Sequence, residues 1–328
     1  MVIAMSIISV VIAIALPVAL AAIINKRFKS GWNIILYGAL AFIAAYFFNL
    51  FVSNQLSTMI NSGSYPWMET TWFSILYPIL IGILTGLLEQ GANWLALRIS
   101  GALGKAWGRG LGLGIGHAGM ESIYAVGIPL LLTVIQVLSL QANGIASLNL
   151  SAPDAASLQE SLNQFYATPW HLPLAVGVDR IFWLVIQLTA AVLTWLAFMK
   201  RGWYWFVAAV GLQAFATAVG MLISYSGISI WASEAIIFVV AVVSAYILYL
   251  VKTRIIDKNP ELLVAPVIPA PEKPEGKADA KLLGKSTEKD DAEFKPSAPL
   301  TTREPKPSKP LIVSTKKSTS KKPGPKKN

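Results

Sequence analysis

Residues 110–140 read GLGLGIGHAGMESIYAVGIPLLLTVIQVLSL. The only Asp, Glu, Lys, Arg or His residues in this stretch are His117 and Glu121. A helix needs about 20 consecutive apolar residues to cross the hydrocarbon core of a bilayer. The stretch is longer than that, and it is continuously apolar rather than alternating, which favours a helix over a strand. We therefore predict a membrane-spanning helix here.

Six further stretches have the same character, at residues 3–24, 33–53, 71–97, 174–199, 203–223 and 231–251. They are too long for barrel strands, and lipid admits only helices or closed barrels. The composition agrees, because 55% of the residues are hydrophobic and only 13% are charged, whereas soluble domains carry about 25% charged residues. The sequence predicts an all-α, polytopic membrane protein with about seven transmembrane helices.

The charge is concentrated at the C-terminal end. Residues 252–328 hold 18 of the 27 Lys and Arg residues, together with many Pro and Ser residues. Such a composition buries too little apolar surface to fold. We therefore predict a transmembrane helical domain at 1–252 and a disordered, cytoplasmic, Lys/Pro-rich tail at 253–328. The tail either attracts anionic lipid headgroups or is merely solvated. Nucleic-acid binding is disfavoured, because aromatic residues do not interleave the lysines.

Basic residues also predict the orientation. Lys and Arg follow the stretches that end at 24, 97, 199 and 251, whereas the loops after 53, 140 and 223 contain none. Cytoplasmic loops carry the excess of Lys and Arg. Arg180 alone departs from this alternation. We predict a multi-pass protein of the cell membrane with its N-terminus outside and its tail in the cytoplasm.

Three ionisable residues lie at membrane depth, where they are costly and often functional. At 1.5 Å per residue, Glu89 lies about 13 Å from the cytoplasmic end of its helix, His117 about 12 Å and Glu121 about 18 Å. His117 and Glu121 are spaced i, i+4 and share a helix face. This spacing suits two metal ligands, or a ligand and a general base. Two glycine ridges, Gly108/Gly112/Gly116 and Gly110/Gly114, predict close helix packing around a functional polar site. The alternative is plain helix packing with a structural His–Glu pair.

Other polar residues are open to simpler interpretations. Gln187 and Gln213 lie at similar depth, where a buried amide usually just bonds a neighbour. Asp179, Arg180 and Glu234 lie near the outer helix ends, and we interpret them as a structural ion pair. The sequence contains no Cys, so thiolate metal sites and Cys nucleophiles are excluded.

Residues 89–94 (EQGANW) and 114–121 (GIGHAGME) resemble the YhfC family of intramembrane metalloproteases, a relative of the CAAX-protease and bacteriocin-processing group. The similarity covers most of residues 1–251. The resemblance implies peptide-bond hydrolysis in the membrane, with zinc held by His117 and Glu121, and Glu89 activating a water. Membrane lipids and a membrane-embedded peptide or protein substrate are the implied partners.

The chain departs from the family pattern at four positions. Gln90 replaces a second Glu, Asn93 replaces an Arg, and Gln187 and Gln213 stand where the family carries His. A neutral amide oxygen is a weak zinc ligand and cannot act as a base. Two alternatives to the protease therefore remain: a catalytically inactive relative that serves as a membrane binding or scaffold protein, and a small solute or proton carrier that uses Glu89 and Glu121.

Overall fold

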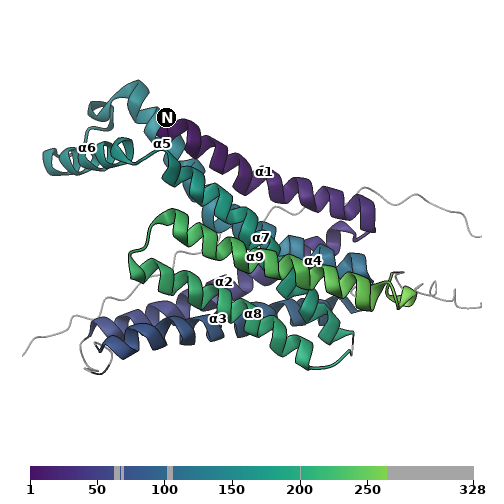
Figure 1. The fold of residues 1–328 in the computed structure, drawn as a ribbon. Helices are drawn as coiled ribbons and strands as arrows, with labels where there is room; N and C mark the ends of the chain where they lie inside the picture. Colours follow the sequence, from purple (N-terminus) through teal and green to yellow (C-terminus); the bar gives the residue numbers. More distant parts are fainter. Residues whose placement is uncertain (63–66, 68–69, 102–105, 200, 264–328) are drawn as a thin grey trace, which may run out of the picture. The chain divides into compact units, whose positions relative to one another are not determined.

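A computed structural model describes residues 1–62, 67, 70–101, 106–199 and 201–263. The regular structure in these ranges is helical, without a strand (Figure 1). The elements are α1 (Val2–Phe28), α2 (Trp32–Asn61), α3 (Thr71–Ser100), α4 (Trp107–Glu121), η3 (Ser122–Gly127), α5 (Ile128–Asn143), η4 (Ile145–Leu148), α6 (Ala152–Ala167), α7 (His171–Phe198), α8 (Tyr204–Ser226), α9 (Ile230–Val251), η5 (Lys252–Ile256) and η6 (Pro260–Leu262).

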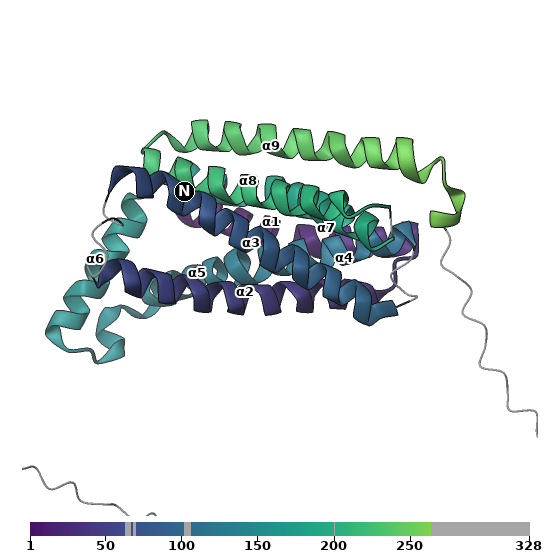
Figure 2. The same cartoon turned by 90° about the horizontal axis from the view of Figure 1, so that it is seen from below.

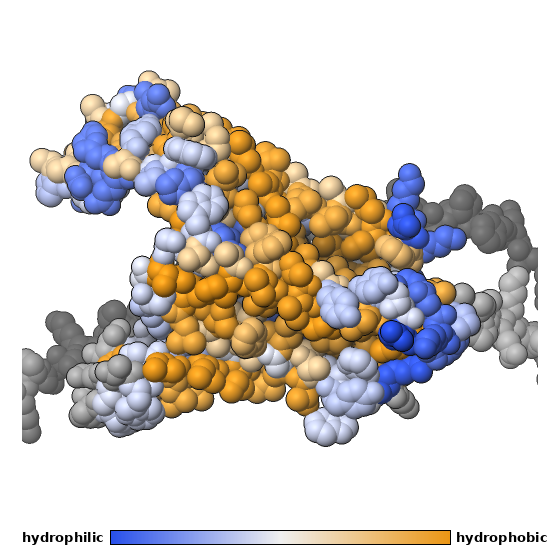
Figure 3. Space-filling view, in the orientation of Figure 1, coloured by the Kyte–Doolittle hydropathy of each residue, from blue (hydrophilic) through white to orange (hydrophobic). Residues whose placement is uncertain are grey.

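The described residues contain seven spans that are long and apolar enough to cross a membrane, which confirms the predicted number. The fourth span, Trp107–Asn143, is composite, because α4 passes through the π-helix η3 into α5. Figure 3 shows a broad apolar surface across the middle of the bundle, with hydrophilic residues gathered at its two ends. This distribution suits a bilayer, where lipid chains cover the apolar middle.

Helix α7 is the centre of the bundle. In its most apolar window 61% of the residues are buried, against at most 33% in any other span. It packs against α1, α3, α4, α8 and α9, and Figure 2 shows α9 lying along the outside of α7 and α8. Because α7 has protein on nearly every side, polar side chains on it can face neighbouring helices instead of lipid.

Helix α4 is packed through its glycines, as predicted. A Cβ atom on Gly116 would lie 2.0 Å from the carbonyl oxygen of Ile35 on α2, and one on Gly108 would lie 2.1 Å from that of Phe28 on α1. The second ridge faces α7, where a Cβ on Gly110 would lie 2.8 Å from the Trp195 ring. In lipid, such backbone approach replaces the hydrophobic drive between helices. The two ridges fix α4 between α2 and α7.

Replacing Gly116 with Ala should therefore destabilise the protein by about 1–3 kcal/mol, a typical cost of overpacking. The added methyl group meets backbone on α2, which cannot rotate away, so the two helices must separate. The control is Gly91→Ala on α3, where a Cβ meets nothing within 4 Å and helix propensity improves. Reversible unfolding in mixed detergent micelles measures the difference. Equal stabilities of the two variants would contradict this packing.

Two features differ from the sequence prediction. The loop predicted between the fourth and fifth spans contains α6, whose N-cap Ser151 accepts a hydrogen bond from the amide of Asp154. The predicted tail begins with packed turns rather than disorder, because Ile256 and Leu262 are buried in the main core. The division into a helical domain at 1–252 and a tail at 253–328 stays a prediction. The remainder of the predicted tail, 264–328, lies outside the described residues.

Candidate functional site

The polar residues predicted at membrane depth meet between α3, α4 and α7. Glu89 projects from α3, and its Oε2 lies 3.6 Å from Nε2 of His117 on α4. The His117 side chain is fully buried, and that of Glu89 is 12% exposed. Adjacent helices thus bring an imidazole and a carboxylate together inside the spanning region, as the helix depths predicted.

Gln187 on α7 joins this pair to the second carboxylate. Its Nε2 donates one hydrogen bond to Glu89 Oε2 at 3.0 Å and another to Glu121 Oε2 at 2.7 Å. One amide group, itself 1% exposed, therefore bridges two acidic side chains from different helices. An amide NH₂ has two hydrogens for this purpose. Gln187, which the sequence left as an ordinary buried amide, is central to the site.

Arg180 brings positive charge to the same place. Its guanidinium pairs with Asp179, and its Nη1 lies 3.7 Å from Glu121 Oε1. The predicted pairing with Asp179 is confirmed, but the view of Arg180 as confined to an outer ion pair was wrong. From here on, Glu89, His117, Glu121, Arg180 and Gln187 are called the polar cluster.

The polar cluster carries more acid than base. Among the described ion pairs, Arg180 faces the carboxyls of Glu121 and Asp179, and the Glu89 carboxyl lies beside His117. Unpaired charge in an apolar medium is strongly unfavourable. The arrangement therefore favours a further positive charge, such as that of a bound cation.

An aromatic wall holds His117 in place. The ring of Phe42 on α2 meets the imidazole edge-on at a centroid distance of 5.6 Å, and Tyr124 lies beyond Phe42. Edge-to-face packing of this kind restricts ring orientation. Neither ring nitrogen of His117 has a hydrogen-bond partner within the part of the chain that the structure describes. The imidazole is thus oriented by packing, with Nε2 near the Glu89 carboxylate and no hydrogen bond to either nitrogen in the described residues.

The backbone changes character directly after Glu121. The π-helix Ser122–Gly127 separates α4 from α5, and Pro129 lies in the first turn of α5. Proline has no N–H to continue the regular hydrogen-bond pattern, and single π-turns often occur at functional sites. Ser122 fixes the segment by donating a hydrogen bond to the carbonyl of Ala13 at 2.9 Å. The sequence signal for this feature was Pro129, which sequence reasoning missed.

The other family-motif positions lie apart from the polar cluster. Gln90 and Asn93 are fully buried, and the Gln90 Oε1 accepts hydrogen bonds from Asn93 at 3.2 Å and from Thr194 on α7 at 2.9 Å. These residues join α3 to α7. His171, the second histidine, begins α7 and packs against the Trp231 ring. It lies sixteen residues before Gln187, or about 24 Å along the helix.

The nitrogen and oxygen atoms of the polar cluster are of the types that bind divalent metal ions. Imidazole nitrogen and carboxylate oxygen are ordinary zinc ligands, and both nitrogens of His117 are buried without a hydrogen-bond partner among the described residues. In the ranges described, however, no three His, Asp or Glu side chains are grouped as metal ligands. The Gln187 amide instead joins the two carboxylates. A metal bound there would require the amide to turn.

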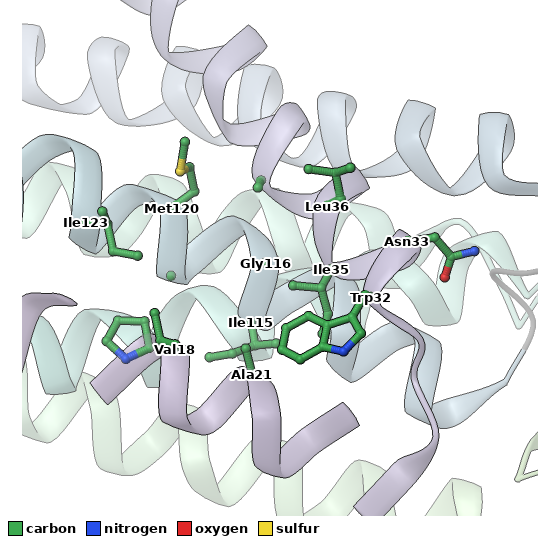
Figure 4. A pocket seen from close by; sticks show the side chains of 13 residues that line it. Val18, Ala21, Trp32, Asn33, Ile35, Leu36, Ile115, Gly116, Met120 and Ile123 are labelled. Atoms are coloured by element: carbon green, nitrogen blue, oxygen red, sulfur yellow. The ribbon is translucent and has the colours of Figure 1, made fainter. Parts of the chain in front are cut away.

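A separate cavity lies on another face of α4 and differs in character. It occupies about 450 Å³ between α1, α2 and α4, with Trp32, Ile35 and Met120 among its lining residues (Figure 4). No Asp, Glu, Lys, Arg or His is among those lining residues. At 100° per residue, Ile115 and Gly119 lie about 160° around α4 from His117, and Met120 lies at the edge of the lining nearest to it. This cavity is therefore not part of the polar cluster.

Comparison with known proteins identifies a family. The sequence model of the YhfC intramembrane metalloprotease family matches residues 12–244. The chain is also 23% identical over 252 residues to "Uncharacterized membrane protein YhfC" of Bacillus subtilis (strain 168), an alignment that covers 74% of this chain and 93% of that protein. No solved structure matches. The family match includes every residue of the polar cluster.

Proposed function

Because this chain belongs to the YhfC intramembrane metalloprotease family, we propose that it hydrolyses a peptide bond of a membrane-embedded or membrane-proximal substrate at the polar cluster. One observation carries the proposal. Within the membrane-spanning region, His117 lies 3.6 Å from Glu89, and Gln187 joins Glu89 to Glu121 by hydrogen bonds of 3.0 and 2.7 Å. Ionisable groups at this depth are usually functional.

In the proposed reaction, Glu89 is the general base. A water loses a proton to the Glu89 carboxylate as its oxygen attacks the scissile carbonyl carbon. That proton passes to the amine as the carbon–nitrogen bond breaks, so Glu89 ends as it began. Before a metal binds, Gln187 holds Glu89 through the 3.0 Å hydrogen bond. Arg180 offsets the negative charge of Glu121, to which it lies within 3.7 Å.

His117 and Glu121 are the proposed protein ligands of a divalent metal, which we propose to be zinc. When bound, zinc supplies Lewis-acid polarisation of the substrate carbonyl. The nitrogens of His117, which are buried and have no hydrogen bond to the described residues, support this assignment. Turning the Gln187 amide by 180° would present its oxygen, which is also unpartnered among the described residues, in place of its NH₂ group.

Metal content tests the assignment independently of activity. The purified protein is expected to retain about one zinc per chain, and His117→Ala is expected to lose it. The matched control is His171→Ala, which removes the other histidine of the chain, far from the polar cluster. Elemental analysis after gel filtration provides the measurement. Metal-free wild-type protein that unfolds at the same temperature with and without added zinc would favour the non-catalytic binding protein.

The proposed setting is the cell membrane, with the N-terminus outside and the chain after α9 in the cytoplasm. The distribution of Lys and Arg supports this orientation, because they cluster at the turns that follow α1, α3, α7 and α9. The polar cluster then lies within the bilayer, and its substrate must reach it through lipid or from one aqueous side.

A further inference from the structure

A second pocket has the polar lining that the cavity of Figure 4 lacks. It occupies about 390 Å³ between α7, α8 and α9, at the end of the bundle where α7 and α9 begin. Asp179, Ser224, Ser233 and Glu234 line it, and Trp183 and Gly220 lie deeper. We call it the acidic pocket. Its carboxyls and hydroxyls suit water, whereas the outside of the bundle is apolar (Figure 3).

The acidic pocket is connected to the polar cluster by ion pairs. Asp179 lines the pocket and pairs with Arg180, and the Nη1 of Arg180 lies 3.7 Å from Glu121 Oε1. Glu121 shares the Gln187 amide with Glu89. A chain of polar side chains therefore leads from the pocket wall to Glu89, the proposed general base. The residues around this chain are mainly apolar.

Two buried amides lie below the pocket, on the helix faces that line it. Gln187 is two turns beyond Asp179 on α7, and Gln213 is two turns before Gly220 on α8, which places each about 10–12 Å deeper. Both residues are 1% exposed, and neither Oε1 has a hydrogen-bond partner in the described ranges. Buried polar atoms without a protein partner are commonly satisfied by ordered water.

Peptide hydrolysis consumes one water for each bond, and lipid does not supply it. We propose that the acidic pocket is the aqueous entrance to the polar cluster, and this inference rests on the proposed function. Water would pass beside Arg180 and the buried amides of Gln187 and Gln213. The entrance opens at the end opposite the basic turns, which the proposed orientation places outside. Trp183, between Asp179 and Gln187 on one face of α7, lines this route.

Cysteine accessibility tests the route without reference to catalysis. The chain contains no Cys, so single variants report one position each, and only a thiol that meets water ionises to react. A membrane-impermeant methanethiosulfonate reagent is applied from either side of sealed vesicles. Ser233→Cys in the pocket and Gln213→Cys below it should both react from the pocket side. Val239→Cys on α9, 59% exposed on the apolar surface, should react at least tenfold more slowly.

A filled pocket should close the route. Gly220→Leu places a side chain in the pocket, where an added Cβ meets only Trp183, at 3.8 Å. It should slow labelling of Gln213→Cys and cleavage of a membrane substrate at least tenfold each. Gly211→Leu is the matched control on α8, since a Cβ there meets nothing within 4 Å. Both rates should stay unchanged in this control.

The outcomes separate this inference from the proposed function. Labelling of Gln213→Cys from neither side, or only from the opposite side, would overturn the entrance even if the protein cleaves substrates. Slowed labelling by Gly220→Leu with undiminished cleavage would show that the pocket does not feed the reaction, which also contradicts the proposal. Labelling as expected in a protein that cleaves nothing would support the aqueous route and remove only the protease.

Discussion

Glu89→Gln should lower cleavage of membrane substrates by a factor of about 10²–10⁴, the usual contribution of a general base. The substitution is nearly isosteric, and the new amide oxygen can still accept the hydrogen bond that Gln187 donates at 3.0 Å. What is lost is the ability to take a proton from water. The variant is therefore expected to keep the fold while losing proton transfer.

New protein N-termini provide the measurement. Membranes of cells that express the wild type are compared by mass spectrometry with those that express Glu89→Gln, and new N-termini within or beside membrane spans are counted. The control is Glu160→Gln on α6, an exposed helix-surface residue that bonds only Gln164 among the described contacts. If the two variants cleave equally well, Glu89 is not the base.

Arg180→Met should destabilise the protein by up to about 3–5 kcal/mol, the cost of removing one partner from a fully buried ion pair. The Arg180 side chain is 13% exposed, and its guanidinium faces both Asp179 and Glu121. Without it, these carboxyls lose their positive neighbour in an apolar surrounding. Methionine preserves the length and apolar stem of the side chain, so packing changes little.

Unfolding in mixed micelles measures this loss of stability. Two further variants test whether its cause is electrostatic. Arg201→Met removes a pair with Glu261 whose side chains are 34% and 63% exposed, and exposed pairs contribute less than about 1 kcal/mol. Adding Glu121→Gln to Arg180→Met should recover part of the stability, because one uncompensated charge disappears. A loss with Arg180→Met no larger than with Arg201→Met would refute the electrostatic role.

The sequence predicted the helices and the depth of their polar residues well. Spans are set by the length of apolar runs, and depth follows from 1.5 Å per residue, so Glu89 and His117 could be brought to one level before any tertiary contact was known. The glycine ridges of α4 were likewise predicted, because a missing Cβ on one helix face has a direct steric meaning.

The side-chain contacts between different helices could not be predicted from helix depth. Gln187 and Gln213 have the same residue type and similar depth, yet only Gln187 contacts the carboxylates in the described structure. The difference depends on the rotation of α7 and α8 about their axes, which depth arithmetic does not contain. Arg180 was assigned to an outer ion pair for the same reason, since its long side chain reaches along α7 toward Glu121.

By itself, the sequence determined that this chain is a bundle of apolar helices with three ionisable residues at one membrane level, because hydrophobicity and helical rise act locally along the chain. The tertiary structure decided that one amide joins the two carboxylates and that Arg180 connects them to the acidic pocket. Those contacts depend on how α3, α4 and α7 rotate and approach one another, and that is set by packing among all the helices together.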